Sequence, residues 1–147
     1  VLGPSGALAV CKAPTVLNAN SDSSCLEGNT IEEFATCTPR CATGYTVTGA
    51  PASGVLLCVF GNLQPSTFTC AGNPCKVPAS IPNGGDKENK TNCVEGNVIP
   101  HNGKCTIRCR EGYVADEGFV SAVCQAGVLF PDAWTCSGKP CPVLTAG

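Results

Sequence analysis

The chain has 147 residues, including 13 cysteines, 17 glycines and 12 prolines, with only 5% aromatic residues and a formal net charge of −2. So few large side chains do not fill one sizeable core, and so many cysteines favour small disulfide-braced units. The net charge argues against nucleic-acid binding through a basic surface, and the sequence lacks the run of about 18 apolar residues that would span a membrane. Because disulfides persist in oxidising compartments, an extracellular location is predicted, either secreted or at the cell surface.

The opening segment, VLGPSGALAV over residues 1–10, is apolar and built of small residues. It has neither a starting methionine nor the basic region of an intact signal peptide. We interpret residues 1–10 as a lead-in, and we expect the chain to be a processed form or a fragment of a longer protein.

A block of 21 residues occurs twice, as CLEGNTIEEFATCTPRCATGY from Cys25 to Tyr45 and as CVEGNVIPHNGKCTIRCREGY from Cys93 to Tyr113. The agreement extends further, because Phe68 and Trp134 each stand directly before a Thr-Cys pair. Such a register indicates two copies of one unit. The predicted domains are residues 11–74 and 75–140, with 141–147 as the start of a third unit or a C-terminal tail.

Within each copy the local patterns predict β-structure. Short alternating runs bounded by glycine, proline and asparagine, at 44–48 and 120–124, are typical of strands, and 81–86 is typical of a turn or loop. Residues 30–35 are the one helical candidate. The predicted fold class is therefore small, disulfide-rich and all-β, with glycines 44 and 112 permitting tight turns.

The motif elements of the second copy resemble a known module. They are Cys75-Lys-Val-Pro78, Cys109-Arg-Glu-Gly-Tyr113, Cys124 and Ala133-Trp-Thr-Cys136. This pattern is similar to the sushi module, also called the complement control protein (CCP) module or short consensus repeat (SCR). The resemblance covers residues 11–141, and the connectors at 71–74 and 137–140 resemble the short linkers of tandem sushi modules. It implies an extended head-to-tail array of two β-modules.

Six cysteines per copy allow 15 pairings, and the sequence alone leaves them open. The usual sushi module has four cysteines, and the extra pair here resembles the six-cysteine modules of selectins. That resemblance implies the disulfides Cys11–Cys58, Cys41–Cys70 and Cys25–Cys37 in the first copy, and Cys75–Cys124, Cys109–Cys136 and Cys93–Cys105 in the second. The first copy departs from the pattern, because Phe68 replaces the usual tryptophan and the Pro-x-Asn-Gly element at 82–85 has no counterpart.

Cys141 is the thirteenth cysteine. It resembles the opening cysteine of a third module, so we expect its partner to lie beyond the end of this chain. The alternatives are an intermolecular disulfide or a free thiol.

Catalysis, metal binding and a cofactor are not predicted. Cys37 and Cys41 have a spacing compatible with zinc, as do Cys105 and Cys109, but His101 is the only histidine. A nucleophile would need that histidine as its base, and it stands in a turn without a match in the first copy. Glu27 and Glu95 recur in the Glu-Gly-Asn tripeptides, where a structural role is expected.

Two surface features of the second copy bear on binding. Asn89-Lys-Thr91 is an N-glycosylation sequon in a polar loop, and a glycan at Asn89 is expected. Lys104, Arg108 and Arg110 alternate with other residues and would share one face of a strand, where they would contact a polyanion or an acidic partner. The alternative, which we favour, is an ordinary solvated face.

The sequence therefore predicts a non-enzymatic extracellular protein of tandem sushi-like repeats, serving as a structural or adhesive rod, stalk or filament component. The competing interpretation is a recognition module that binds a protein or glycan, as complement regulators and selectin-like receptors do. Partners would be a protein or further copies of the chain, and no nucleic acid. Surface features that differ between the repeats would favour recognition, whereas a surface shared by every repeat would favour assembly.

Overall fold

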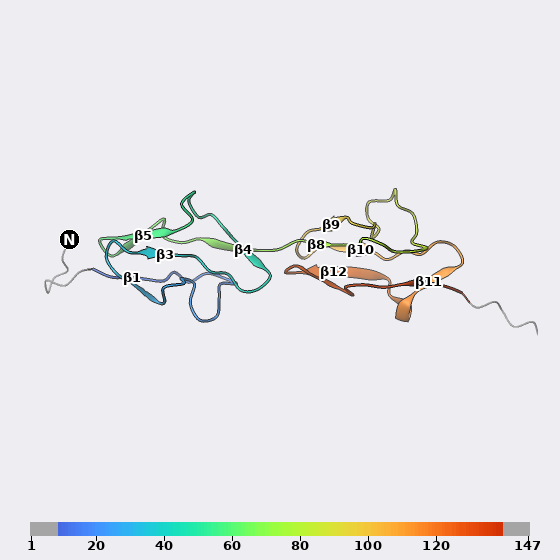
Figure 1. Ribbon diagram of the computed structural model, residues 1–147, viewed down its shortest axis with the longest axis horizontal. Coiled ribbons are helices and arrows are strands. Elements are labelled where there is room, and N and C mark those ends of the chain that lie inside the picture. Colours follow the sequence, from blue (N-terminus) through green and yellow to red (C-terminus); the bar gives the residue numbers. More distant parts are fainter. Residues whose placement is uncertain (1–8, 140–147) are drawn as a thin grey trace, which may run out of the picture. The chain divides into compact units, whose positions relative to one another are not determined.

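The structure is a computed structural model that describes residues 9–139 (Figure 1), so residues 1–8 and 140–147, including Cys141, lie outside the described part. Its regular elements are short β-strands, and the only helical element among residues 9–139 is a 3₁₀ turn, η1, at Asp116–Gly118. This confirms the predicted all-β, disulfide-rich fold class. The described part contains no helix with the length and apolar character needed to cross a membrane.

The chain divides into two compact units between Gly72 and Asn73, two residues before the predicted boundary. The reason lies in the backbone hydrogen bonds. Gly72 still pairs with Tyr45 in a strand ladder of the first unit. The carbonyl of Asn73 accepts the Gly127 N–H of the second unit, with 2.9 Å between nitrogen and oxygen.

Unit 1 consists of three antiparallel sheets. A two-stranded sheet opens the unit, a three-stranded sheet of order β3-β5-β6 forms its middle, and a second two-stranded sheet closes it. The strands pair as β1 (Cys11–Lys12) with β2 (Thr30–Ile31), β5 (Leu56–Val59) with both β3 (Thr36–Cys37) and β6 (Asn62–Gln64), and β4 (Tyr45–Thr48) with β7 (Thr69–Gly72).

Unit 2 repeats this topology strand for strand. Its strands are β8 (Cys75–Lys76) with β9 (Val98–Ile99), β12 (Ser121–Gln125) with both β10 (Lys104–Thr106) and β13 (Val128–Phe130), and β11 (Tyr113–Ala115) with β14 (Cys136–Gly138). The strands predicted near 44–48 and 120–124 correspond to β4 and β12. The helix considered at 30–35 is wrong, because Thr30–Ile31 pairs with β1 and a turn follows it.

Six disulfides brace the structure, three inside each unit. Each unit has two long-range bridges and one local bridge across a sequence separation of 12 residues. Each long-range bridge restricts the unfolded chain and stabilises the fold by about 2–4 kcal/mol. The bridges have the pairing that the sushi resemblance implies: Cys11–Cys58, Cys25–Cys37, Cys41–Cys70, Cys75–Cys124, Cys93–Cys105 and Cys109–Cys136.

Around these bridges each unit buries a small apolar cluster. Phe68 and Trp134 hold equivalent places, with 3% and 5% of their surface exposed. In unit 1 half of the cluster is cysteine, and the members are Cys11, Cys25, Ile31, Cys37, Leu56, Cys58, Leu63 and Phe68. In unit 2 Val77, Ile81, Ile99 and Ile107 join the cystines, and Tyr113 packs against the cluster from the edge.

A turn near the start of each unit has the same conformation, although the first copy lacks the Pro-x-Asn-Gly sequence element at 82–85. The Ala19 N–H donates to the Val16 carbonyl at 3.2 Å, and the Gly84 N–H donates to the Ile81 carbonyl at 3.0 Å. Asn18 (φ 64°) and Asn83 (φ 61°) both take the left-handed conformation, which asparagine adopts more readily than most residues. The two turns therefore match, although only unit 2 has proline and glycine around the asparagine.

Two other turns place bulky residues in the left-handed conformation. In unit 1 Phe34 has φ 64° and Phe60 has φ 51°, whereas their unit 2 counterparts are Asn102 (φ 66°) and Ala126 (φ 48°). Phe60 is the first residue of a two-residue hairpin turn, followed by Gly61, between β5 and β6. Such turns need positive φ at both positions and favour Asn-Gly, so phenylalanine here carries backbone strain.

We predict that Phe60→Asn raises the free energy of unfolding of unit 1 by about 1 kcal/mol, because it removes strain that costs roughly 1–3 kcal/mol and creates the preferred Asn-Gly pair. Urea unfolding with disulfides intact, followed by the amide signals of β5 and β6, measures this. Trp134 fluorescence reports on unit 2 in the same sample and should not change. Ala126→Asn is the matched control and should give a smaller gain, and a fall in the stability of unit 1 would contradict the assignment of strain.

Candidate interaction surfaces

The cysteines of the described part are engaged in disulfides, so no thiolate is available there for catalysis or metal binding. Cys37 and Cys41, the pair with zinc-like spacing, belong to two different bridges, as do Cys105 and Cys109. Residues 9–139 also contain no group of three or more histidine, cysteine, aspartate or glutamate side chains arranged to hold a metal ion.

His101 has a structural partner that sequence reasoning missed. Its Nδ1 atom accepts the Ala126 N–H at 2.9 Å, which ties one turn to the next. In unit 1 the Oε1 atom of Glu33 accepts the Phe60 N–H in the equivalent place. Unit 1 has no histidine at the equivalent position, but Glu33 performs the same hydrogen-bonding role there. The signal available was position: both residues stand four places before the second cysteine of the local bridge.

The two Glu-Gly-Asn carboxylates are structural, and they have different partners. Glu27 accepts both the N–H and the hydroxyl of Thr38 at 2.7 Å, whereas Glu95 pairs with the Lys87 ammonium at 3.1 Å. Partial burial raises the pKa of Glu27, but the hydrogen bonds from Thr38 outweigh it and the pKa lies below its ordinary value. The hydrogen bond from Lys87 lowers the pKa of Glu95 in the same direction.

Asp116 is a third carboxylate of this kind. It accepts the N–H of Thr135 at 2.8 Å and also the Thr135 hydroxyl, and these hydrogen bonds lower its pKa. The contact ties the turn after β11 to the irregular segment that precedes β14. All three carboxylates thus fix the geometry of the loops in which they lie.

The basic residues of unit 2 lie on less regular backbone than the sequence predicts. Strand β10 ends at Thr106, so a single strand reaching Arg110 is wrong, because Ile107 bonds to Val120 outside the ladder. Lys104, Arg108 and Arg110 are nevertheless all exposed. The guanidinium of Arg110 lies 5.2 Å from the centroid of the Tyr113 ring, a cation–π contact within the unit. The role of these three side chains in binding a polyanion or partner stays a prediction.

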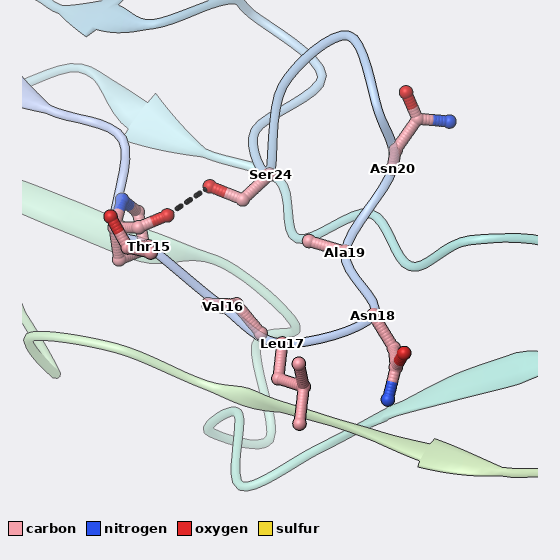
Figure 2. Close-up of a pocket in the computed structure, with 8 residues that line it drawn as sticks. Thr15, Val16, Leu17, Asn18, Ala19, Asn20 and Ser24 are labelled. Atoms are coloured by element: carbon pink, nitrogen blue, oxygen red, sulfur yellow. Dashed lines mark hydrogen bonds between the residues drawn. The ribbon is translucent and has the colours of Figure 1, made fainter.

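Unit 1 has two open grooves on either side of residues 15–17. One has a volume of about 450 Å³ and is formed by residues 14–20 and Ser24, whose hydroxyl donates to the Pro14 carbonyl at 2.6 Å (Figure 2). The other, of about 370 Å³, lies between residues 15–17 and 67–70. The half-buried Val16 lines both grooves and the buried Phe68 lines the second, and unit 2 has the larger Ile81 and Trp134 at the equivalent positions.

Exposed apolar side chains accompany these grooves and the locally bridged loop. Leu17 is 84% exposed at the tip of its turn, and Leu26 is 60% exposed just after the first cysteine of the loop. Phe34, in the loop closed by Cys25–Cys37, contacts Phe60 edge to face, with 5.8 Å between ring centroids. The loop whose sequence varies most between the copies thus presents an apolar surface in unit 1.

The sequon of unit 2 lies in an exposed turn. The Oδ1 atom of Asn89 accepts the N–H of Thr91 at 3.0 Å and its hydroxyl at 2.7 Å, and the asparagine side chain itself is exposed. An accessible sequon in a disulfide-braced protein meets the requirements for N-glycosylation in a secretory pathway.

We predict that the chain secreted from eukaryotic cells carries an N-glycan at Asn89. Intact-mass measurement before and after enzymatic removal of N-glycans would show a heavier species that collapses to the polypeptide mass. Thr91→Ala should abolish the shift, because it removes the sequon while keeping the asparagine. Secreted chain at the bare polypeptide mass would contradict the assignment.

The lowered carboxylate pKa values predict sensitivity to acid. Folded-state pKa values below those of the unfolded chain mean that the folded state binds fewer protons at moderately acidic pH. Their contribution to stability is therefore complete above the unfolded pKa, near 4.5 for Glu27, and is lost as the pH falls through the folded pKa. Thermal unfolding between pH 7 and pH 2 should show stability decreasing below pH 4.5. Glu27→Gln should weaken that decrease for unit 1, and an unchanged profile would contradict the role of Thr38.

Comparison with known proteins shows which family this architecture belongs to. No protein-family model matches the chain. The mouse (Mus musculus) protein named "Sushi, von Willebrand factor type A, EGF and pentraxin domain-containing protein 1" is 32% identical over 132 residues, which cover 88% of this chain. The rat (Rattus norvegicus) protein of the same name is 31% identical over 108 residues, or 72% of the chain. The alignments span 3% of the length of each relative. Two repeated three-disulfide β-units and relatives that contain sushi domains together identify the chain as a pair of six-cysteine sushi-like modules.

Proposed function

We propose that this chain is a non-enzymatic extracellular interaction segment, whose two sushi-like modules contact protein partners through surfaces that differ between them. The disulfide content supports an extracellular or cell-surface location, since such bridges persist in oxidising compartments. The sushi-containing relatives support interaction rather than catalysis.

The observation that carries the proposal is a repeated scaffold under an unrepeated surface. Strand order, bridge positions and turn conformations agree between the units. At exposed positions the chemistry differs: Leu17 matches Pro82 in the equivalent turns, and Phe34 matches Asn102. Residues 11–74 contain two basic and four acidic residues, whereas 75–140 contain seven of each. Identical surfaces would suit self-assembly of a rod, whereas divergent surfaces suit separate partners.

A structural role, as a rod, stalk or filament component in a head-to-tail array, is the second candidate. Its support is the repetition itself, because units that mainly touch their chain neighbours suit an array. The arrangement of the modules along such an array, like the third module that would begin at Cys141, stays a prediction.

The two candidate functions predict different behaviour of the chain, both in solution and in contact with extracellular matrix. We expect the chain to sediment as a monomer from nanomolar to micromolar concentration, and to bind saturably to extracellular matrix deposited by cultured cells. The Cys141→Ser variant is run in parallel to remove disulfide cross-linking by the thirteenth cysteine. Polymers in both samples under negative stain would replace the proposal with the structural role.

Module-specific variants then test whether the surfaces act separately. Leu17→Ser alters unit 1, and the triple change Lys104→Ser, Arg108→Ser and Arg110→Ser alters unit 2, all at exposed positions. If the modules use different surfaces, one variant weakens matrix binding about tenfold and the other leaves it unchanged, as expected for loss of a contact worth 1.4 kcal/mol. Absence of saturable binding by the unaltered chain would refute the proposal.

A further inference from the structure

Phe34 and Phe60 form an exposed aromatic pair on unit 1. Their exposed fractions are 58% and 51%, and their rings meet edge to face, with an interplanar angle of 78°. Phe34 comes from the turn before β3, and Phe60 from the hairpin turn between β5 and β6. Two large apolar side chains from separate turns thus converge at the surface.

The fold does not require phenylalanine at either place. Unit 2 builds the same two turns with Asn102 and Ala126, and the φ angles agree within a few degrees. Bulky residues with positive φ are strained, and strained residues that persist at a surface point to function. The pair is therefore better explained by a contact it makes than by folding.

A buried carboxylate adjoins the pair, because Glu33 precedes Phe34 in the sequence and accepts the backbone N–H of Phe60. Glu33 is 7% exposed, its Oε1 atom accepts the Phe60 N–H, and its Oε2 atom is buried without a hydrogen-bond partner among residues 9–139. Glu32, which is exposed, adds a second acidic side chain next to it in the sequence. The one ion pair of the described part, Lys87–Glu95, is in unit 2, so no described cation compensates Glu33. A buried carboxyl oxygen without a hydrogen-bond partner is costly and favours a donor nearby, and an arginine or lysine side chain supplies both the donor and a complementary charge.

We propose that Phe34, Phe60 and Glu33 form a binding site for a cationic side chain, arginine or lysine, of a protein partner; this proposal rests on the proposed interaction function. The ring faces attract a cation through their quadrupole, and the buried carboxylate adds an attraction that solvent screens only weakly. A purely apolar occupant would cover the rings but leave the carboxylate uncompensated. The Arg110–Tyr113 contact illustrates this attraction within unit 2.

The direct test uses a pair of small probes with the 147-residue chain. Nα-acetyl-arginine methylamide carries the cation, and Nα-acetyl-citrulline methylamide has the same shape without the charge. Titration followed by ¹H–¹⁵N NMR should give saturable shifts at the amides of residues 32–35 and 59–61 with the arginine probe. We expect a dissociation constant of about millimolar order, and affinity for the citrulline probe lower by at least about twofold to fivefold.

Three variants assign the contributions. Phe34→Ala and Phe60→Asn each remove one ring and should each weaken arginine binding about twofold to fivefold. Glu33→Gln removes the charge but keeps an oxygen that can accept the Phe60 N–H, so the turn should survive while binding weakens. Native-like spectra of β5 and β6 confirm that each variant is folded.

Unit 2 offers the matched gain-of-function control. The triple change His101→Glu, Asn102→Phe and Ala126→Phe copies the unit 1 residues onto turns of the same shape. It should create a second arginine site, seen as new saturable shifts at residues 100–103 and 125–127. If this variant does not fold, the loss-of-function variants in unit 1 still decide the question.

Equal affinity for both probes, or arginine affinity unchanged by Glu33→Gln and by removal of the rings, would overturn the proposal. The result is separable from the proposed function. Matrix binding that persists without an arginine site at Phe34 and Phe60 would refute only the present inference. Arginine binding there by a chain that does not bind matrix or any protein would refute the proposed function instead.

Discussion

The cystine bridges are the constraint on which the rest of this structure depends. Each unit has too few residues and too few large side chains to bury a core that would be stable alone. In unit 1 four of the eight residues in the buried cluster are cysteines, so the bridges also serve as core packing. The long-range pairs, such as Cys11–Cys58 and Cys41–Cys70, fix both ends of the unit at once.

Covalent bracing explains why the two units diverge without losing the fold. Unit 1 has Phe68 where unit 2 has Trp134, and Val16 where unit 2 has Ile81, yet the strand order is the same in both units. In a fold held by apolar packing alone, such reductions in side-chain volume would remove a large share of the free energy of unfolding. Here the strand order and the positions of the bridges persist despite these differences. The same bracing holds the strained turn at Phe60, because bridges that each contribute about 2–4 kcal/mol offset a strain of roughly 1–3 kcal/mol.

The sequence predicts the skeleton of this protein well, because the repeated cysteine spacing marks two units and the resemblance to sushi modules implies the pairing of their bridges. Glycines 44 and 112 both have φ 88°, as their predicted role in tight turns requires. The errors arise where tertiary hydrogen bonds decide. Residues 30–35 look helical locally, but Thr30 and Ile31 pair with β1. The alternation from Lys104 to Arg110 suits a strand, yet the ladder ends at Thr106.

The candidate site was harder to predict, because its parts carry no shared sequence motif. Phe34 and Phe60 are 26 positions apart, and only the meeting of two turns brings their rings together. Comparison with unit 2, where asparagine and alanine occupy the same turns, shows that the left-handed conformation does not require phenylalanine. The internal repeat thus acts as its own comparison: shared features belong to the scaffold, and the differences mark the surface.

Glu33 and His101 show how such differences arise without damage to the fold. Each supplies one acceptor atom to the backbone N–H of the hairpin turn, so this N–H has a hydrogen-bond partner in both units. Beyond that atom their chemistry differs, because a carboxylate adds an acidic group where the imidazole in its accepting tautomer adds no charge. The residue at this position must therefore accept a hydrogen bond, whereas the charge of its side chain can vary. One scaffold can in this way present different electrostatic surfaces in successive modules, without any change in its turns or bridges.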